Sequence, residues 1–159
     1  MSVVVLGASV SPFVRKVRAF LAEKGVAYEL DPVNPFSPPE GWRLLSPLGR
    51  IPALRDGDRT LADSSVICAY LERRFPRPAL YPGDDFEYAR ALWFEEFMDG
   101  GFVPIAGPKV FLPLVLAPML GGKPPDAATE AAAQEVVAKD LAKLWDYLER
   151  ELGEREFFV

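Results

Sequence analysis

The first half of the chain alternates short apolar runs with amphipathic ones. Residues 2–6 are rich in valine and apolar at four successive positions, which predicts a buried strand. Residues 12–24 collect apolar side chains on one face and basic side chains on the other, which predicts a helix that ends at Gly25. Residues 26–30 alternate between apolar and polar positions, as a second strand would.

The polar stretch that follows is divided by prolines. Four prolines between residues 32 and 39 predict a loop, and residues 40–45 fit a short helix after it. A strand is expected to begin at Pro52, whose missing N–H suits the first residue of a strand, and residues 59–61 are expected to form its hairpin partner across the turn at 56–58.

The next amphipathic run begins at Asp63-Ser64-Ser65 and continues to Phe75. Asp and Ser are favoured at helix N-termini because their side-chain oxygens accept hydrogen bonds from unpaired backbone N–H groups. The first half therefore reads as strand, helix, strand, short helix, strand, strand, helix.

The second half carries helical patterns only. Residues 78–84 are punctuated by proline and glycine and predict a linker. Residues 85–99 repeat apolar side chains at helical spacing, and Gly100-Gly101 is expected to stop that helix. A last helix begins after Asp126 and ends at Gly153. The expected division of the chain is residues 1–77, the linker 78–84 and a helical region at 85–159.

Residues 102–120 are almost wholly apolar, with Lys109 as their single charge. A membrane-spanning helix needs about 20 such residues. Prolines at 104, 108, 113 and 118 argue against such a helix, because each removes a backbone donor. We expect a kinked, buried helical segment and no membrane association.

Composition and charge exclude several kinds of chemistry. A net charge of −5 over 159 residues argues against a general nucleic-acid binder. The chain has no histidine and one cysteine, Cys68, so Ser-His-Asp and Cys-His catalysis and the usual zinc sites are removed. A single cysteine allows no internal disulfide, and no secretory leader is evident, so a reducing, cytoplasmic setting is expected. Cys68 itself is interpreted as a packed core residue.

Candidate chemistry lies where the first strand passes into the first helix. Ser11 followed by Pro12 predicts a helix start, and a helix N-terminus attracts anions. The pattern leaves two roles open for Ser11, a helix cap or a donor that stabilises a thiolate. Ser9 is the second candidate for that donor, although its position fits a turn residue better. The basic residues of this helix are interpreted as a solvated face that also adds positive potential near the anion site: Arg15, Lys16 and Arg18.

Three motifs follow one another along the first half of the chain. They are Ser-Pro-Phe-x-x-Lys-Val-Arg at 11–18, Pro-Leu-Gly-Arg-Ile-Pro-Ala-Leu at 47–54 and Asp-Ser-Ser-x-Ile-x-x-Tyr-Leu at 63–71. In this order, with a helical region after them, they resemble the glutathione S-transferase superfamily, in particular its serine-type, bacterial-like cytosolic members. The resemblance implies an α/β thioredoxin-like domain with a mixed four-stranded sheet, followed by an all-α domain. The helical region of this chain is shorter than the family's, so we expect it to be incomplete and to leave an apolar surface uncovered.

The resemblance implies that glutathione is the cosubstrate and that Ser11 is the catalytic residue. Lowering a thiol pKa by about two units requires about 2.7 kcal/mol, and a hydrogen bond to a charged group contributes about 1.5–3 kcal/mol. One serine is therefore sufficient, and no histidine base is needed. The residues implied to bind glutathione are Phe13, Arg50, Ile51, Pro52, Asp63 and Ser64.

Each of these residues also has an ordinary structural explanation. The resemblance implies that Pro52 is a cis proline that exposes the backbone of Ile51 to the cysteinyl part of glutathione, although only about 5–6% of X-Pro bonds are cis. Arg50 is implied to lie near the glycine carboxylate, or else it is a solvated loop charge. Asp63 and Ser64 cap a helix and are implied to bind the γ-glutamyl end as well.

Three functions fit these motifs. The first is a glutathione transferase that acts on small apolar electrophiles, in the manner of a detoxification enzyme. The second is a glutathione-dependent isomerase, dehalogenase or peroxidase, and the third is a non-catalytic interaction module. The complete set of motifs favours an enzyme over a module, whereas the shortened helical region argues the other way. The transferase is the function expected, with a homodimer and no metal or nucleic acid. The candidates for an electrophile pocket are Trp93, Phe97 and Phe111, each of which also fits a core position.

Overall fold

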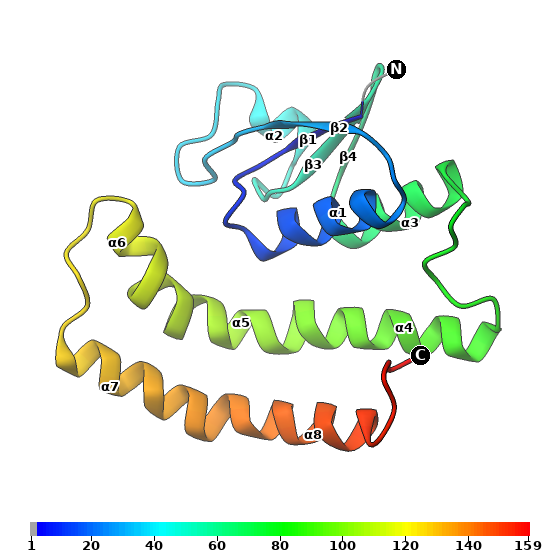
Figure 1. Cartoon of the computed structure of the whole chain (residues 1–159). Coiled ribbons are helices and arrows are strands. Elements are labelled where there is room, and N and C mark those ends of the chain that lie inside the picture. The colour runs from blue at the N-terminus through cyan, green and yellow to red at the C-terminus, as the bar shows by residue number, and fades with distance from the viewer. Residues whose placement is uncertain (1–2) are drawn as a thin grey trace. The chain divides into compact units, whose positions relative to one another are not determined.

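The computed structural model describes residues 3–159, and the chain folds into two compact units, one ending at Tyr81 and the other beginning at Pro82. The first unit contains a four-stranded sheet with the strand order β2-β1-β3-β4 (Figure 1). Strand β1 pairs in parallel with β2 and antiparallel with β3, which pairs antiparallel with β4, so the expected mixed sheet is confirmed. The elements of this unit are β1 (Val3–Leu6), α1 (Pro12–Glu23), β2 (Tyr28–Asp31), α2 (Trp42–Leu45), β3 (Ala53–Asp56), β4 (Arg59–Ala62) and α3 (Ser64–Arg74).

Strand β1 is buried along its whole length because both faces of the sheet are covered. Val3 and Val5 pack with α1 and α3 on one face, whereas Val4 and Leu6 pack with Trp42 of α2 on the other. This arrangement explains why four consecutive apolar residues form a strand. The larger core consists of Val3, Val5, Val14, Val17, Leu21, Leu54, Ile67, Cys68 and Leu71, so Cys68 is the packed residue that we expected.

The expected elements of the first unit are confirmed, with small shifts at their ends. Helix α1 begins at Pro12, and Gly25 follows it with a φ of +64°. Strand β2 begins at Tyr28, two residues later than the alternation indicates, and α2 begins at Trp42.

The second unit is helical. The helix that begins at Asp85 continues without a break to Met119, so the expectation that Gly100-Gly101 stops it is wrong. Glycine costs a helix about 1 kcal/mol relative to alanine, and the long helix tolerates that cost here. Wide π-helical turns carry the backbone past prolines such as Pro113, which lack an N–H donor. The elements are α4 (Asp85–Glu96), η1 (Phe97–Phe102), α5 (Val103–Ala106), η2 (Gly107–Leu116), α6 (Ala117–Met119), α7 (Ala127–Val136), η3 (Val137–Leu141) and α8 (Ala142–Leu152).

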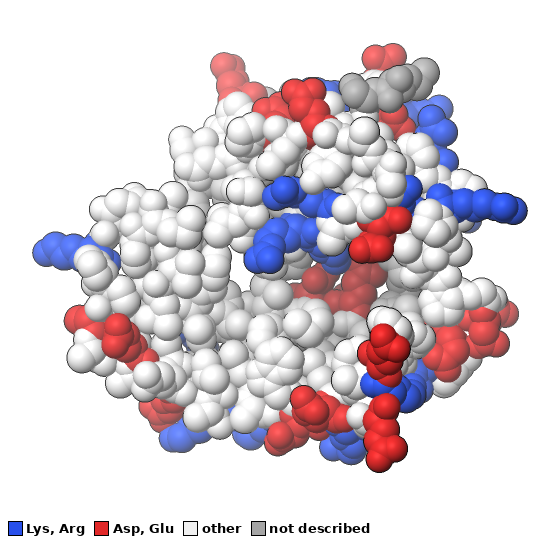
Figure 2. Space-filling view, viewed as in Figure 1, with Lys and Arg blue, Asp and Glu red and all other residues white. Residues whose placement is uncertain are grey.

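Residues 102–120 are helical as expected, but they are not buried. No residue of η2 or α6 is buried, and Met119 is 64% exposed. On the face drawn in Figure 2, the surface over α5 and α6 is almost free of charged side chains. Among residues 3–159, the helix Asp85–Met119 is the one that is long and apolar enough to cross a membrane, with a mean hydropathy of 1.6 over its most apolar window. A single helix of this kind is weak evidence for a membrane protein, because other proteins also contain helices of this length and apolar composition.

The last helix agrees with the sequence pattern. Asp126 caps α7 by accepting a hydrogen bond from the N–H of Thr129 at 2.8 Å. The helix continues through η3 into α8 and ends at Gly153, whose φ is +56°. Its buried apolar residues are Ala133, Leu141 and Leu148.

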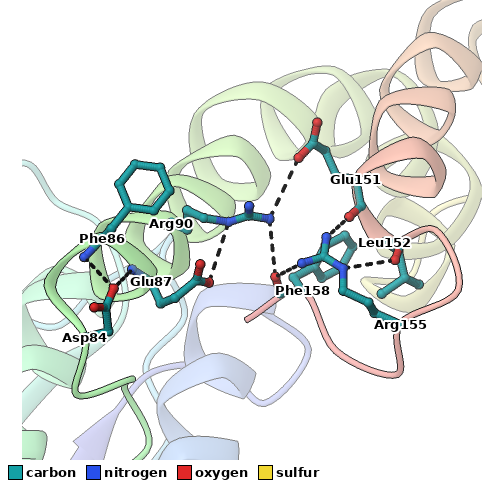
Figure 3. A network of polar contacts seen from close by, with 8 residues as sticks. All are labelled: Asp84, Phe86, Glu87, Arg90, Glu151, Leu152, Arg155 and Phe158. Carbon is teal, nitrogen blue, oxygen red and sulfur yellow. Dashed lines mark hydrogen bonds and ion pairs between the residues drawn. The ribbon is translucent and has the colours of Figure 1, made fainter.

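Arg90 ties α4 to α8 and to the chain that follows it (Figure 3). Its guanidinium lies 3.7 Å from the carboxylate of Glu87 and 3.9 Å from that of Glu151 on α8. It also donates a hydrogen bond to the carbonyl of Phe158 at 3.4 Å. Arg155 donates to the same carbonyl at 3.2 Å, and to the carbonyl of Glu151. These contacts fold the last residues of the chain back onto the second unit.

Candidate functional site

The sheet register brings the three sequence motifs to one end of the sheet. Leu6 of β1 lies opposite Ala53 of β3, and Ala53 lies opposite Ala62 of β4. The residues one step beyond these pairs are Gly7, Pro52 and Asp63, which therefore lie in a row across the sheet. Helices α1 and α3 both begin just beyond this row. Their N-termini carry unpaired N–H groups and partial positive charge, so this end of the sheet is suited to an anion.

Gly7 is the point where the first two motifs come into contact. A Cβ atom at Gly7 would lie 2.6 Å from Cγ2 of Val14 and 3.3 Å from Cβ of Ile51, with Pro52 Cα at 3.7 Å. Contacts below 3.0 Å require neighbouring atoms to move. A residue without a side chain is therefore needed here to let the start of α1 approach the loop before β3.

Ser11 is the N-cap of α1, as expected. Its Oγ accepts a hydrogen bond from the N–H of Val14 at 3.4 Å, and the residue is half-buried. A hydroxyl has two acceptor lone pairs and one donor proton, so the cap occupies only an acceptor position. The two roles left open by the sequence are therefore compatible, because Ser11 can cap the helix and still donate its proton to an anion. Phe13, two residues later, is also half-buried.

The Ile51–Pro52 peptide bond is cis, which confirms the expectation drawn from the resemblance. Pro52 is buried, Ile51 is half-buried, and Arg50 is exposed at the edge of the loop. The exposed position of Arg50 fits both of the roles considered for it, a solvated charge and a contact to a bound carboxylate.

Asp63 and Ser64 begin α3. The Oδ1 atom of Asp63 accepts hydrogen bonds from the N–H groups of Ser65 at 3.0 Å and Val66 at 3.2 Å, so Asp63 is a helix cap. Its φ of +79° is the only positive value among the non-glycine residues at positions 3–159. Such conformations cost about 1–3 kcal/mol and cluster at functional sites. Ser64 is the first residue of α3 and is only 4% exposed.

Lys16 makes a contact that the sequence pattern did not predict. We interpreted it as part of a solvated face, but it is half-buried and its Nζ donates a hydrogen bond to Oγ of Ser65 at 3.0 Å. Its ammonium group therefore lies at the N-terminus of α3 and adds positive charge to the site. The two residues are 49 positions apart, so no local pattern could have revealed the contact.

The aromatic candidates lie in the second unit. Trp93 and Phe97 have ring centroids 6.2 Å apart, and Phe97 lies 4.8 Å from the ring of Tyr147 on α8. The indole N–H of Trp93 donates to the hydroxyl of Tyr147 at 2.6 Å. These contacts give Trp93 and Phe97 a packing role between α4 and α8, although Trp93 remains 53% exposed. Phe111 lies on η2 and is half-buried.

A polar cluster lies at the other end of β3, away from the row at Gly7. Tyr70 donates its hydroxyl proton to Oδ2 of Asp56 at 2.7 Å, and Arg74 lies 3.4 Å from the same oxygen. The hydrogen bond from Tyr70 holds the pKa of Asp56 below its usual value of 3.8, with a smaller contribution from Arg74. The same bond raises the pKa of Tyr70 above 10.0. A cavity of about 290 Å³ lies beside this cluster and is lined by Leu54, Asp56, Arg59, Thr60, Leu61 and Tyr70.

Comparison with known proteins shows which proteins this chain is similar to. Residues 5–79 match the family model described as "Glutathione S-transferase, N-terminal domain". The chain is 34% identical over 159 residues to "Glutathione S-transferase 3" of Zea mays, covering 96% of this chain and 68% of the maize protein. It is 48% identical over 67 residues to the "Stringent starvation protein A homolog" of Haemophilus ducreyi, covering 42% of this chain and 31% of that protein.

Solved structures agree with the sequence comparison. A structure of glutathione S-transferase III in its apo form matches with a TM-score of 0.74 and 32% identity, over 99% of this chain and 72% of that chain. A structure of glutathione S-transferase-I bound with lactoylglutathione matches with a TM-score of 0.76 and 26% identity, over 99% of this chain and 76% of that chain. The expected thioredoxin-like domain followed by a helical region is thus confirmed.

Proposed function

Because this chain belongs to the glutathione S-transferase family, we propose that it binds glutathione at the row formed by Gly7, Pro52 and Asp63 and activates the thiol with Ser11. The relatives named glutathione S-transferase align with most of the chain and support a transferase activity. The chain spans 68% of the maize relative, so the activity is proposed here for the residues that this sequence contains.

The observation that carries the proposal is the hydroxyl of Ser11 at the N-terminus of a 12-residue helix, beside the cis proline loop. A free thiol has a pKa of about 8.5, so only a few per cent is ionised at neutral pH. A hydrogen bond from a hydroxyl to a thiolate contributes about 1.5–3 kcal/mol, and the helix N-terminus adds up to about 1 kcal/mol. Together they lower the thiol pKa by about two units, which makes the thiolate the main form near neutral pH.

The rest of glutathione is assigned to the neighbouring residues. The backbone of Ile51 pairs with the cysteinyl part, and Arg50 lies within reach of the glycine carboxylate. The γ-glutamyl end meets the start of α3, where Asp63 and Ser64 are found and where the ammonium of Lys16 adds positive charge. Phe13 supplies an apolar wall. No metal is required, because the ionised sulfur is itself the nucleophile.

The reaction is a nucleophilic substitution or addition. The thiolate forms a carbon–sulfur bond with the electrophile, and a leaving group departs with its electron pair where one is present. We assign small apolar electrophiles to this protein, with Trp93, Phe97 and Phe111 as candidate contacts. A cytoplasmic location, a role in detoxification and a homodimer belong to the same proposal.

The test is binding followed by turnover. We expect the protein to be retained on immobilised glutathione and eluted by free glutathione. We expect it also to conjugate a chloronitroaromatic electrophile, measured by the absorbance of the product, with chloride released in equal amount. Retention without conjugation would contradict a transferase, and absence of retention would contradict glutathione binding altogether.

A second candidate is a non-catalytic interaction module. It is favoured by the 48% match to the Haemophilus ducreyi protein, which covers 42% of this chain and is not named as a transferase. The experiment above separates the two, since a module would show no conjugation at any glutathione concentration.

A further inference from the structure

Ser46 occupies a buried position just before the loop that carries Arg50 and Ile51. It is only 2% exposed, and its Oγ donates a hydrogen bond to the backbone carbonyl of Arg50 at 2.8 Å. A buried serine is uncommon unless its hydroxyl has a partner, and here the partner is the residue that precedes Ile51.

The backbone of Ser46 closes the same loop at two further points. Its carbonyl accepts from the N–H of Gly49 at 2.8 Å, and its N–H donates to the carbonyl of Trp42 at 2.9 Å. Trp42 is itself 2% exposed and packs with Val4, Leu6 and other residues under the sheet. Ser46 therefore connects the packed core beneath the sheet to the loop that leads to Pro52.

Arg43 supports the outer side of this loop. Its guanidinium donates to the carbonyl of Pro47 at 3.2 Å. A Cβ atom at Gly49 would lie 3.4 Å from Nη2 of Arg43, and Gly49 has a φ of +70° that glycine adopts without strain. The turn at 46–50 is thus held from the buried side by Ser46 and from the exposed side by Arg43.

We propose that Ser46 is a positioning residue, which fixes the carbonyl of Arg50 and so orients the backbone of Ile51 before glutathione arrives. This inference rests on the proposed function. Ordering a loop in advance removes part of the entropy cost of binding. The hydrogen bond from Ser46 to Arg50 should therefore raise the affinity for glutathione. It should not change the chemistry at sulfur, because Ser11, and not Ser46, is proposed to contact the sulfur.

The test compares Ser46→Ala with Ser37→Ala, a matched change at an exposed serine of the preceding loop. Loss of one buried hydrogen bond predicts that Ser46→Ala weakens glutathione binding about fivefold and raises KM by the same factor. The kcat and the pKa of the bound thiol stay unchanged. Binding of S-methylglutathione, which has no thiol to ionise, weakens by the same factor. Ser37→Ala behaves like the wild type in each assay.

A second variant and a ligand-free measurement make the test independent of turnover. Arg43→Leu, at an exposed position, is expected to weaken binding in the same direction. In hydrogen–deuterium exchange without ligand, the amides of residues 47–51 should exchange faster in Ser46→Ala than in the wild type. Unchanged exchange, or a fall in kcat with affinity intact, would overturn the positioning role. Absence of glutathione binding by the wild type would instead overturn the proposed function, while the exchange result still decides whether Ser46 orders the loop.

Discussion

At the scale of single residues, the site depends on side chains that meet two demands at once. Ser11 caps α1 with an acceptor lone pair and keeps its proton for another acceptor. Asp63 caps α3 and adopts a positive φ at the proposed site. Gly7 contributes by having no side chain, which lets Val14 and Ile51 approach each other. The structure therefore predicts strong effects from very small substitutions at these positions.

Among these substitutions, Gly7→Ala is expected to have the clearest effect on stability and binding. Its new methyl group would lie 2.6 Å from Cγ2 of Val14, so the buried side chain of Val14, helix α1 or the loop at Ile51 must move. We expect a loss of about 1–3 kcal/mol in the free energy of unfolding, measured by urea denaturation, together with weaker glutathione binding.

Two further variants control this prediction. Gly100→Ala lies where an added Cβ meets no atom within 4 Å, so it is expected to leave stability unchanged or to raise it. The double variant Gly7→Ala/Val14→Ala removes the clashing methyl and is expected to recover part of the lost glutathione affinity. Wild-type stability and affinity in Gly7→Ala alone would contradict the close approach.

The sequence could identify some residues of the site but not others. Ser11, Asp63 and Ser64 stand at helix starts, so local capping patterns identified them as candidates. Pro52 was singled out only by resemblance, because nothing local distinguishes a cis from a trans proline. The contact of Lys16 to Ser65 could not be predicted, because it exists only once α1 and α3 are packed together.

At the scale of elements, α1 and α3 were predictable because caps and apolar spacing are local. The prediction that the helix ends at Gly100-Gly101 was wrong, because glycine permits a turn without requiring one. The chain continues there as a helix with π-helical turns. The prediction that residues 102–120 are buried was also wrong. An apolar pattern shows that a segment can be buried, but not which other residues pack against it.

Contacts between elements hold the first unit together beyond its sheet. The side chain of Lys24 at the end of α1 is fully buried, and its Nζ contacts Glu72 of α3 and the carbonyl of Pro78, each at 2.5 Å. Glu72 also accepts from the N–H of Leu80 at 3.2 Å. These contacts fasten the segment after α3 to both helices.

The Tyr70–Asp56 bond between α3 and β3 gives stability a pH dependence. The folded pKa of Asp56 lies below 3.8, so its contribution is present above that pH and is lost as the pH falls through the folded value. The folded pKa of Tyr70 lies above 10.0, so the same contribution is present below pH 10.0 and is lost as the pH rises through the folded value. Tyr70→Phe should lower the free energy of unfolding by about 1.5–3 kcal/mol at neutral pH, measured by urea denaturation. The difference from the wild type should shrink in acid.

Tyr28→Phe is the matched control for this pH dependence. The hydroxyl of Tyr28 accepts from Nε of Arg18 at 2.9 Å, so this hydrogen bond involves no carboxylate. Its effect on stability should therefore be the same at neutral and acid pH. Equal pH profiles for Tyr70→Phe and Tyr28→Phe would contradict the role given to Asp56.

At the scale of the whole molecule, the family relationship extends over both units. The maize relative aligns with 96% of the chain, and the apo transferase III structure with 99% of it. The same relatives are longer, with 68% and 72% of their lengths covered. The glutathione site proposed here is built by the first unit alone, so its affinity and thiol chemistry can be measured on this chain as it stands.

The most direct measurement is an ultraviolet titration of the thiol in the protein–glutathione complex, for the wild type, Ser11→Ala and Ser9→Ala. Ser9 is exposed, so the last variant controls for loss of a hydroxyl near the site. Circular dichroism checks that Ser11→Ala keeps α1, since loss of the cap costs about 1 kcal/mol. We expect a bound thiol pKa about two units below that of free glutathione in the wild type and Ser9→Ala. In Ser11→Ala we expect the bound thiol pKa to rise by about one to two units, because the hydroxyl is lost while the helix N-terminus remains. A Ser11→Ala complex that titrates like the wild type would contradict this account.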